Sequence, residues 1–156
     1  MSRLILVLAL LAACGPSLED QENKARTALN ARDWAAATAA ADEALANPKA
    51  DDAAGWRLNQ IKLDAAASSG KGSETSILIE ALASKYPAQV KAPLYRSLAD
   101  KSKAAGDNMG AIDILAAGDK RFPEEHDQFV AAIDALKNAS QDPAEIEKLK
   151  ALGYIN

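Results

Sequence analysis

The sequence predicts an all-helical protein built as a short solenoid of antiparallel helical hairpins. Hydrophobic residues make up 49% of the chain, but only 4% of residues are aromatic, and alanine, the best helix former, supplies much of the rest. Valine, which favours strands, occurs after residue 13 only at Val90 and Val130. Three similar segments end at Pro48, Pro87 and Pro123, which are 39 and 36 residues apart. A period of this length, with two helices in each unit, is typical of a helical repeat array.

Turn-forming residues divide the chain into eight expected helices. Proline disfavours helix in the residue before it and suits the first turn of the next helix. Asp33, Asp107 and Asp142 each stand where a side chain can cap the following helix, and Gly153 suits a helix end. The helices are expected at residues 19–31, 34–46, 51–68, 73–85, 89–105, 108–121, 124–138 and 143–152. The alternative to stacked hairpins is an irregular antiparallel bundle of alanine-rich helices.

Residues 1–13 have the features of a secretory signal segment. Arg3 precedes an uncharged apolar run from Leu4 to Ala13, and small residues stand at the end of that run. The run is too short to cross a bilayer, which needs about 20 apolar residues. Two other interpretations stay open: cleavage by the ordinary signal peptidase to release a secreted protein, and an uncleaved apolar segment buried within a cytosolic protein.

The end of this segment, Leu11-Ala12-Ala13-Cys14, resembles the lipobox of bacterial lipoproteins. The resemblance implies that Cys14 carries covalent lipid and is the first mature residue, with residues 14–20 as a tether to the folded domain at 21–156. Cys14 is the only cysteine, so an exported chain cannot use it for an internal disulfide. Gly15 rather than aspartate follows it, which in such lipoproteins implies the outer membrane and a periplasmic orientation.

Residues 92–123 resemble one tetratricopeptide repeat, a helical hairpin with large, small and turn residues at set places. Residues 21–48 and 54–87 resemble the repeat less fully, and residues 124–152 are expected to cap the array. Ser102, Asn108 and Gly118 depart from the family pattern in the best repeat. The residues at matching offsets there are Tyr95, Leu98, Ala99, Gly106, Ala111, Leu115 and Pro123.

The resemblance implies a concave surface formed by the first helix of each hairpin, where an envelope protein or peptide would bind. Carried over from the family positions, Arg96, Asp100 and Lys103 are expected to line that surface in the best repeat. The weaker equivalents in the preceding repeat are Arg57, Ile61 and Asp64. The competing interpretation for all six is an ordinary solvated helix face, since charge at helical spacing is common.

Composition and motifs favour a binding protein over an enzyme. The net charge of −4 disfavours nucleic-acid binding and leaves the covalent lipid as the expected membrane anchor. His126 is the only histidine, so a histidine metal cluster is not expected. No cofactor is expected beside the covalent lipid on Cys14. The segment at 69–73 lacks the spacing of a phosphate loop, and no small-molecule substrate is expected. Trp56 could join a binding surface, although core packing is favoured for the large aromatic residues: Trp34, Trp56, Tyr95 and Phe129.

The alternative function is a structural accessory subunit or periplasmic chaperone of an envelope assembly complex, without a ligand groove of its own. A large exposed apolar patch would favour that interpretation over a charged groove. An enzyme is the least favoured class, because the sequence contains no reactive constellation of side chains.

Overall fold

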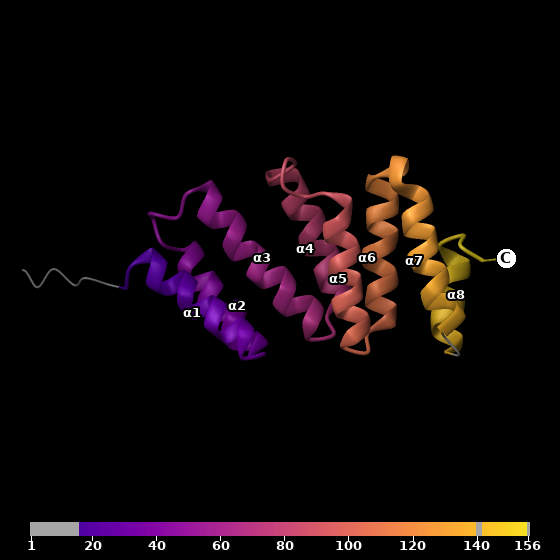
Figure 1. Ribbon diagram of the computed structural model, residues 1–156, viewed down its shortest axis with the longest axis horizontal. Coiled ribbons are helices and arrows are strands. Elements are labelled where there is room, and N and C mark those ends of the chain that lie inside the picture. The colour runs from indigo at the N-terminus through magenta and orange to yellow at the C-terminus, as the bar shows by residue number, and fades with distance from the viewer. Residues whose placement is uncertain (1–15, 140–141, 156) are drawn as a thin grey trace, which may run out of the picture.

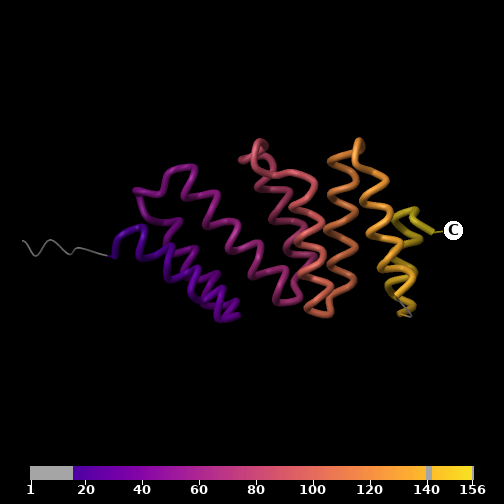
Figure 2. Tube along the Cα trace, in the orientation of Figure 1, coloured from indigo at the N-terminus to yellow at the C-terminus, as the bar shows by residue number. Residues whose placement is uncertain are grey.

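The computed structural model describes residues 16–139 and 142–155, and these residues confirm the all-helical prediction. The helices follow one another in chain order along the long axis of the molecule, with α1 and α2 at one end and α7 and α8 at the other (Figures 1 and 2). No helix in this part of the chain is long and apolar enough to span a membrane. The elements are α1 (Leu18–Asn30), α2 (Trp34–Leu45), α3 (Asp52–Ser68), α4 (Gly72–Lys85), α5 (Ala92–Ala104), α6 (Asn108–Arg121), a 3-10 turn η1 (Pro123–Glu125), α7 (His126–Ala139) and α8 (Pro143–Ala151).

The signal segment at 1–13 and Cys14 lie outside the described residues. The expected caps lie within them and are confirmed. The carboxylates of Asp33, Asp107 and Asp142 accept hydrogen bonds from amides in the first turns of α2, α6 and α8, at 2.8–3.0 Å. Each bond satisfies an amide that has no partner inside its own helix.

Two helices begin two or more residues later than predicted. α5 starts at Ala92 rather than at residue 89, because the amides of Gln89 and Val90 donate to the Tyr86 carbonyl in a separate turn. The expected helix at 124–138 begins as a 3-10 turn, and α7 starts at His126. Both differences fall just after a proline, where the chain leaves one helix before it enters the next.

The turns between α1 and α2, α3 and α4, and α5 and α6 share one backbone geometry, which also ends α8 at Gly153. Each contains one residue in the left-handed conformation, namely Arg32 (φ 60°), Gly70 (φ 75°) and Gly106 (φ 84°). In each turn the amide of that residue donates to the carbonyl three residues earlier, and the next amide donates to the carbonyl five residues earlier. This pair of bonds is the Schellman motif, which ends a helix and usually has glycine at the left-handed position.

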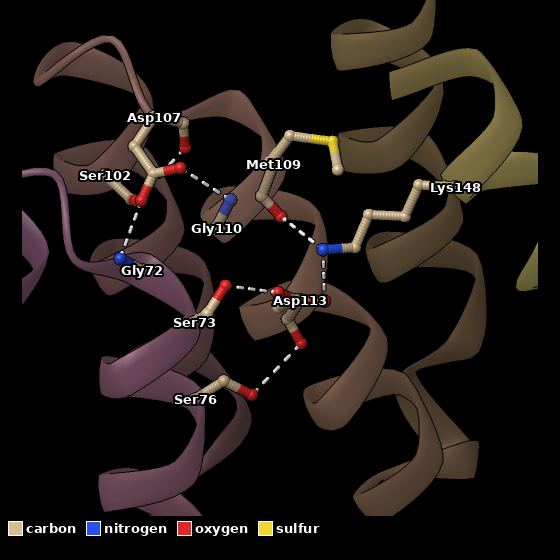
Figure 3. Close-up of polar contacts among 9 residues, drawn as sticks. All are labelled: Gly72, Ser73, Ser76, Ser102, Asp107, Met109, Gly110, Asp113 and Lys148. Carbon is tan, nitrogen blue, oxygen red and sulfur yellow. Dashed lines mark hydrogen bonds and ion pairs between the residues drawn. The ribbon is translucent and has the colours of Figure 1, made fainter. Parts of the chain in front are cut away.

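α4 and α6 pack backbone against backbone through two glycines (Figure 3). A Cβ atom placed on Gly72 would lie 2.5 Å from the Cα atom of Gly110, so only glycine permits this contact. The amide of Gly72 donates to the Asp107 carboxylate at 2.7 Å, and the same carboxylate caps α6 through the Gly110 amide at 2.8 Å. Asp107 therefore caps two neighbouring helices at once.

A second group of polar contacts links α4, α6 and α8 beside this contact (Figure 3). The Asp113 carboxylate accepts a hydrogen bond from the Ser73 hydroxyl at 2.6 Å and pairs with the Lys148 ammonium, also at 2.6 Å. Lys148 donates in addition to the Met109 carbonyl at 3.1 Å. These bonds hold α8 against α6 at the end of the helix row.

The hydrophobic core has two parts that meet in α3. The larger part runs from α3 to α8 and contains the buried rings of Tyr95 and Phe129. The smaller part joins α1, α2 and α3 and is built mostly from alanine, with Leu58 and Ile61 as its large residues. Because alanine buries little apolar area, the first two helices gain less hydrophobic stabilisation than the helices that follow.

Candidate protein-binding surface

Arg57, one of the predicted binding residues, ties α3 to α1. Its guanidinium donates two parallel hydrogen bonds to the Glu22 carboxylate, both at 2.9 Å. Arg26 donates to the same carboxylate at 3.0 Å. The Arg57 hydrogen bond is the main cause that holds the pKa of Glu22 below its ordinary value, and it outweighs the opposing effect of burial. The Arg57 side chain is still 47% exposed, so a partner could reach it.

Asp64 and Arg96 extend this row of interhelical ion pairs. Asp64 on α3 pairs with Lys101 on α5. Arg96 on α5 pairs with Glu125 in η1 at 2.8 Å, and its guanidinium lies 5.5 Å from the centre of the Phe129 ring. Arg57, Asp64 and Arg96 thus each pair with a residue of another helix or turn.

The other three predicted residues differ from one another in exposure. Asp100 and Lys103 are exposed, and neither forms an ion pair or side-chain hydrogen bond with the residues described here. Ile61 is a correction to the predicted surface, because its side chain is only 3% exposed and packs in the smaller core. α1 and α2 cover the side of α3 on which Ile61 lies, and the sequence pattern of α3 alone did not show this.

We use the term first-helix face for Arg57, Asp64, Arg96, Asp100 and Lys103 together. Arg57, Asp64 and Arg96 are held by ion pairs between helices, whereas Asp100 and Lys103 are free to meet a partner. Surface ion pairs of this kind are typically worth less than about 1 kcal/mol, so a partner could exchange them at small cost.

A cleft that sequence reasoning missed surrounds Trp34 at the start of α2. Two hollows of about 800 and 300 Å³ meet there, and both are lined by Arg32 and Trp34. The larger hollow lies along α2 and reaches Ser69 and Lys71 before α4. The smaller one reaches the ends of α3 and α5. We call this the Trp34 cleft.

The cleft is open because α2 does not pack on α4 as α4 packs on α6. Trp34 lies two residues after the left-handed Arg32, and Gly72 lies two residues after the left-handed Gly70, so the two positions are equivalent. The Trp34 indole prevents α2 and α4 from packing backbone against backbone as α4 and α6 do. Lys71 stands where Asp107 stands, and an ammonium cannot accept a hydrogen bond from the facing helix amide. These two substitutions are the signal from which the cleft could have been predicted.

A partly exposed carboxylate connects α4, α5 and α6 elsewhere in the molecule. Glu80 accepts a hydrogen bond from the Tyr95 hydroxyl and two from Arg121, at 2.9 and 3.2 Å. Burial raises the pKa of Glu80, but the bonds from Arg121 and Tyr95 outweigh it and keep the pKa below its ordinary value. Burial and the same bond raise the pKa of Tyr95. These charges satisfy one another, which favours a structural role.

The single histidine lies beside a carboxylate on α6. The Nδ1 atom of His126 is 2.7 Å from one Asp119 oxygen, and the Tyr154 hydroxyl donates to the other at 2.7 Å. Burial is the main cause that raises the pKa of Tyr154, and the bond to Asp119 adds to it. Asp119 thereby holds the chain after α8 against α6. Among the described residues no group of three or more histidine, cysteine or acidic side chains is placed to hold a metal ion.

The remaining candidates from the sequence, residues 69–73 and Trp56, are engaged in contacts within the fold. Residues 69–71 form the turn between α3 and α4, and residues 72–73 begin α4, where the Gly72 amide is already bonded to Asp107. Trp56 is partly buried, and its ring centre lies 5.4 Å from that of Tyr86.

No protein-family model, no curated protein and no solved structure matches this chain.

Proposed function

We propose that this protein is a lipid-anchored scaffold of the bacterial cell envelope, built as a short tetratricopeptide-like solenoid that binds a partner protein or peptide. The observation that carries this proposal is the recurrence of one turn at Arg32, Gly70 and Gly106, with spacings of 38 and 36 residues. The same turn at nearly constant spacing is expected when similar helical hairpins are stacked. A stacked array offers an extended surface for a partner, and so supports binding as the function.

The partner would bind across the first-helix face. Asp100 and Lys103 are one turn apart on α5 and carry opposite charges without a counter-ion among the described residues. Arg96, one turn before Asp100 on α5, and Arg57 on α3 are partly exposed as well. A face with unpaired charges of both signs selects a partner by complementary charge, which mainly sets specificity and the rate of association.

Site-specific photocrosslinking in the bacterial envelope tests this face. A photoreactive amino acid at Asp100 should capture a defined partner, whereas the same group at Ile77, which is 74% exposed on α4, should not. The charge reversals Asp100→Lys and Lys103→Glu should weaken capture by a neighbouring probe at Ser97, because they reverse the charges proposed to meet the partner. Neither change breaks an ion pair of the fold. Lys49→Glu, at an exposed loop position, is the matched control. Equal capture at Asp100 and Ile77 would contradict the assignment of the face.

The membrane anchor is tested separately. Mass spectrometry of protein extracted from membranes should find Cys14 as the first residue, carrying diacylglycerol and an acyl chain. Two or three chains at about 0.8 kcal/mol per buried methylene would hold the protein stably, whereas a single chain binds only marginally. Cys14→Ser should abolish the modification. An unmodified chain that still begins at Met1 would refute the anchor and leave the binding face to be tested by itself.

A further inference from the structure

The Trp34 cleft combines an apolar floor with a cation that the protein does not use. Trp34 packs against the alanine-rich core and is partly exposed. Alanine residues of α2 form much of the adjoining wall of the larger hollow. Arg32 lines both hollows, is exposed, and makes no side-chain hydrogen bond or ion pair with any described residue.

The acidic residues of the cleft keep their charge but are held by bonds within the fold, which leaves Arg32 as the charged group free to bind a ligand. The Asp33 carboxylate caps α2 through the Ala36 amide at 3.0 Å. Asp42 pairs with Lys62 on α3 at 2.6 Å. Lys71, across the cleft from α2, has only a 3.5 Å contact to an exposed glutamate. An incoming carboxylate would therefore meet Arg32 and Lys71 without displacing a strong pair.

Arg32 holds this position against a backbone preference. Its φ of 60° is the only positive φ outside glycine in the described chain, and both equivalent turns use glycine. The left-handed conformation disfavours residues with a Cβ atom, and such strain concentrates at functional positions. The strained backbone and the unpaired guanidinium are separate observations, and both point to the Arg32 side chain as a binding group.

We propose that the Trp34 cleft is a second docking site, which takes an acidic, apolar segment of a partner protein. An apolar side chain of that segment packs on the Trp34 indole, and an adjacent carboxylate binds Arg32, with Lys71 beside it. This proposal does not depend on the first-helix face, and it would remain valid if no partner bound to that face.

Synthetic peptides provide the test, with full-length protein in detergent. The probe is a fluorescein-labelled 12-residue peptide in which leucine alternates with glutamate. The matched peptides replace glutamate with lysine, or leucine with serine. Fluorescence anisotropy should show the leucine–glutamate peptide binding at least about tenfold more tightly than either control, which is the size expected when one charge-assisted bond or one apolar anchor is lost. Equal binding of the leucine–lysine peptide would overturn the proposal.

Variants then locate the site. Arg32→Gly should lower the affinity about tenfold while preserving the fold, because glycine is the residue that the other two turns use. Lys49→Glu, at an exposed loop position outside the cleft, should leave the affinity unchanged. Unchanged binding to the Arg32→Gly protein, or an equal loss with Lys49→Glu, would refute the cleft as the site.

Tryptophan fluorescence gives a second measurement that does not depend on a variant of Trp34. In a Trp56→Phe protein, Trp34 is the only tryptophan. A leucine–glutamate peptide with one leucine replaced by bromophenylalanine should quench its emission, because bromine quenches tryptophan on contact. The unbrominated peptide is the control. Binding without quenching would place the peptide elsewhere and overturn the proposal.

Discussion

The substitution Gly72→Ala tests whether the backbone contact of α4 and α6 stabilises the fold. The added Cβ atom would lie 2.4 Å from the Ser102 hydroxyl oxygen and 2.5 and 2.6 Å from two backbone carbons of Gly110. Because carbon atoms in contact prefer 3.5–4.0 Å, the two helices must move apart by about 1 Å. The same movement would stretch the 2.7 Å bond from the Gly72 amide to Asp107 beyond hydrogen-bonding range.

The expected cost follows from these contacts. Overpacking typically costs about 1–3 kcal/mol, and the loss of a helix cap costs about 1 kcal/mol. Alanine is favoured over glycine by at most about 1 kcal/mol within a helix, and by less at its first residue. We therefore expect Gly72→Ala to lower the free energy of unfolding by about 2 kcal/mol, and Tm by roughly 8 °C.

Urea denaturation followed by circular dichroism at 222 nm measures this change. Glu74→Ala is the control, because Glu74 is exposed in the same turn and should change the free energy of unfolding by less than about 0.5 kcal/mol. The double variant Gly72→Ala/Gly110→Ala should cost less than the two single variants added together, since both disturb one contact. A cost for Gly72→Ala within about 0.5 kcal/mol of zero would refute the argument that glycine is required there.

Three further predictions concern caps, turn strain and pH. Asp107→Ala should lower the free energy of unfolding by about 2 kcal/mol in urea denaturation, because it uncaps two helices. Asp33→Ala uncaps one helix and should lower it by about 1 kcal/mol. Equal losses would contradict the shared cap. Arg32→Gly should raise the free energy of unfolding by roughly 0.5–1 kcal/mol in the same assay, since glycine removes the strain of a positive φ, and a decrease would refute that account. The pKa of Glu22 is depressed by Arg57, so its contribution is present above its ordinary pKa of about 4.3 and is lost as the pH falls through the folded-state pKa. Glu22→Gln should cost about 1 kcal/mol at pH 7, and the gap to wild type should narrow by pH 3; a gap independent of pH would exclude the carboxylate charge as its source.

Local chemistry made much of the fold predictable. The carboxylates at Asp33, Asp107 and Asp142 bond to amides two or three residues away, so the residue types and their spacing are enough to place three helix starts. Gly106 likewise ends α5 through bonds within its own turn. The errors at the starts of α5 and α7 arose after prolines, where a short turn and a helix start have similar sequence signals.

The candidate binding surface was predictable only in part. The helical spacing of Arg96, Asp100 and Lys103 places them on one side of α5, and Asp100 and Lys103 are exposed. The same spacing on α3 could not show that α1 and α2 cover Ile61. Nor could it show which carboxylate would meet Arg57, because Glu22 is 35 residues away along the chain.

The sequence by itself determined the helical class, the caps and the turns, because each depends on bonds between residues within five positions of one another. Only the tertiary structure decided how closely neighbouring helices pack. The contact of Gly72 with Gly110, and the cleft that Trp34 keeps open where the equivalent contact would form, depend on residues more than thirty positions apart. Such contacts arise when whole helix faces meet, so the volume of one side chain decides between a closed interface and an open one.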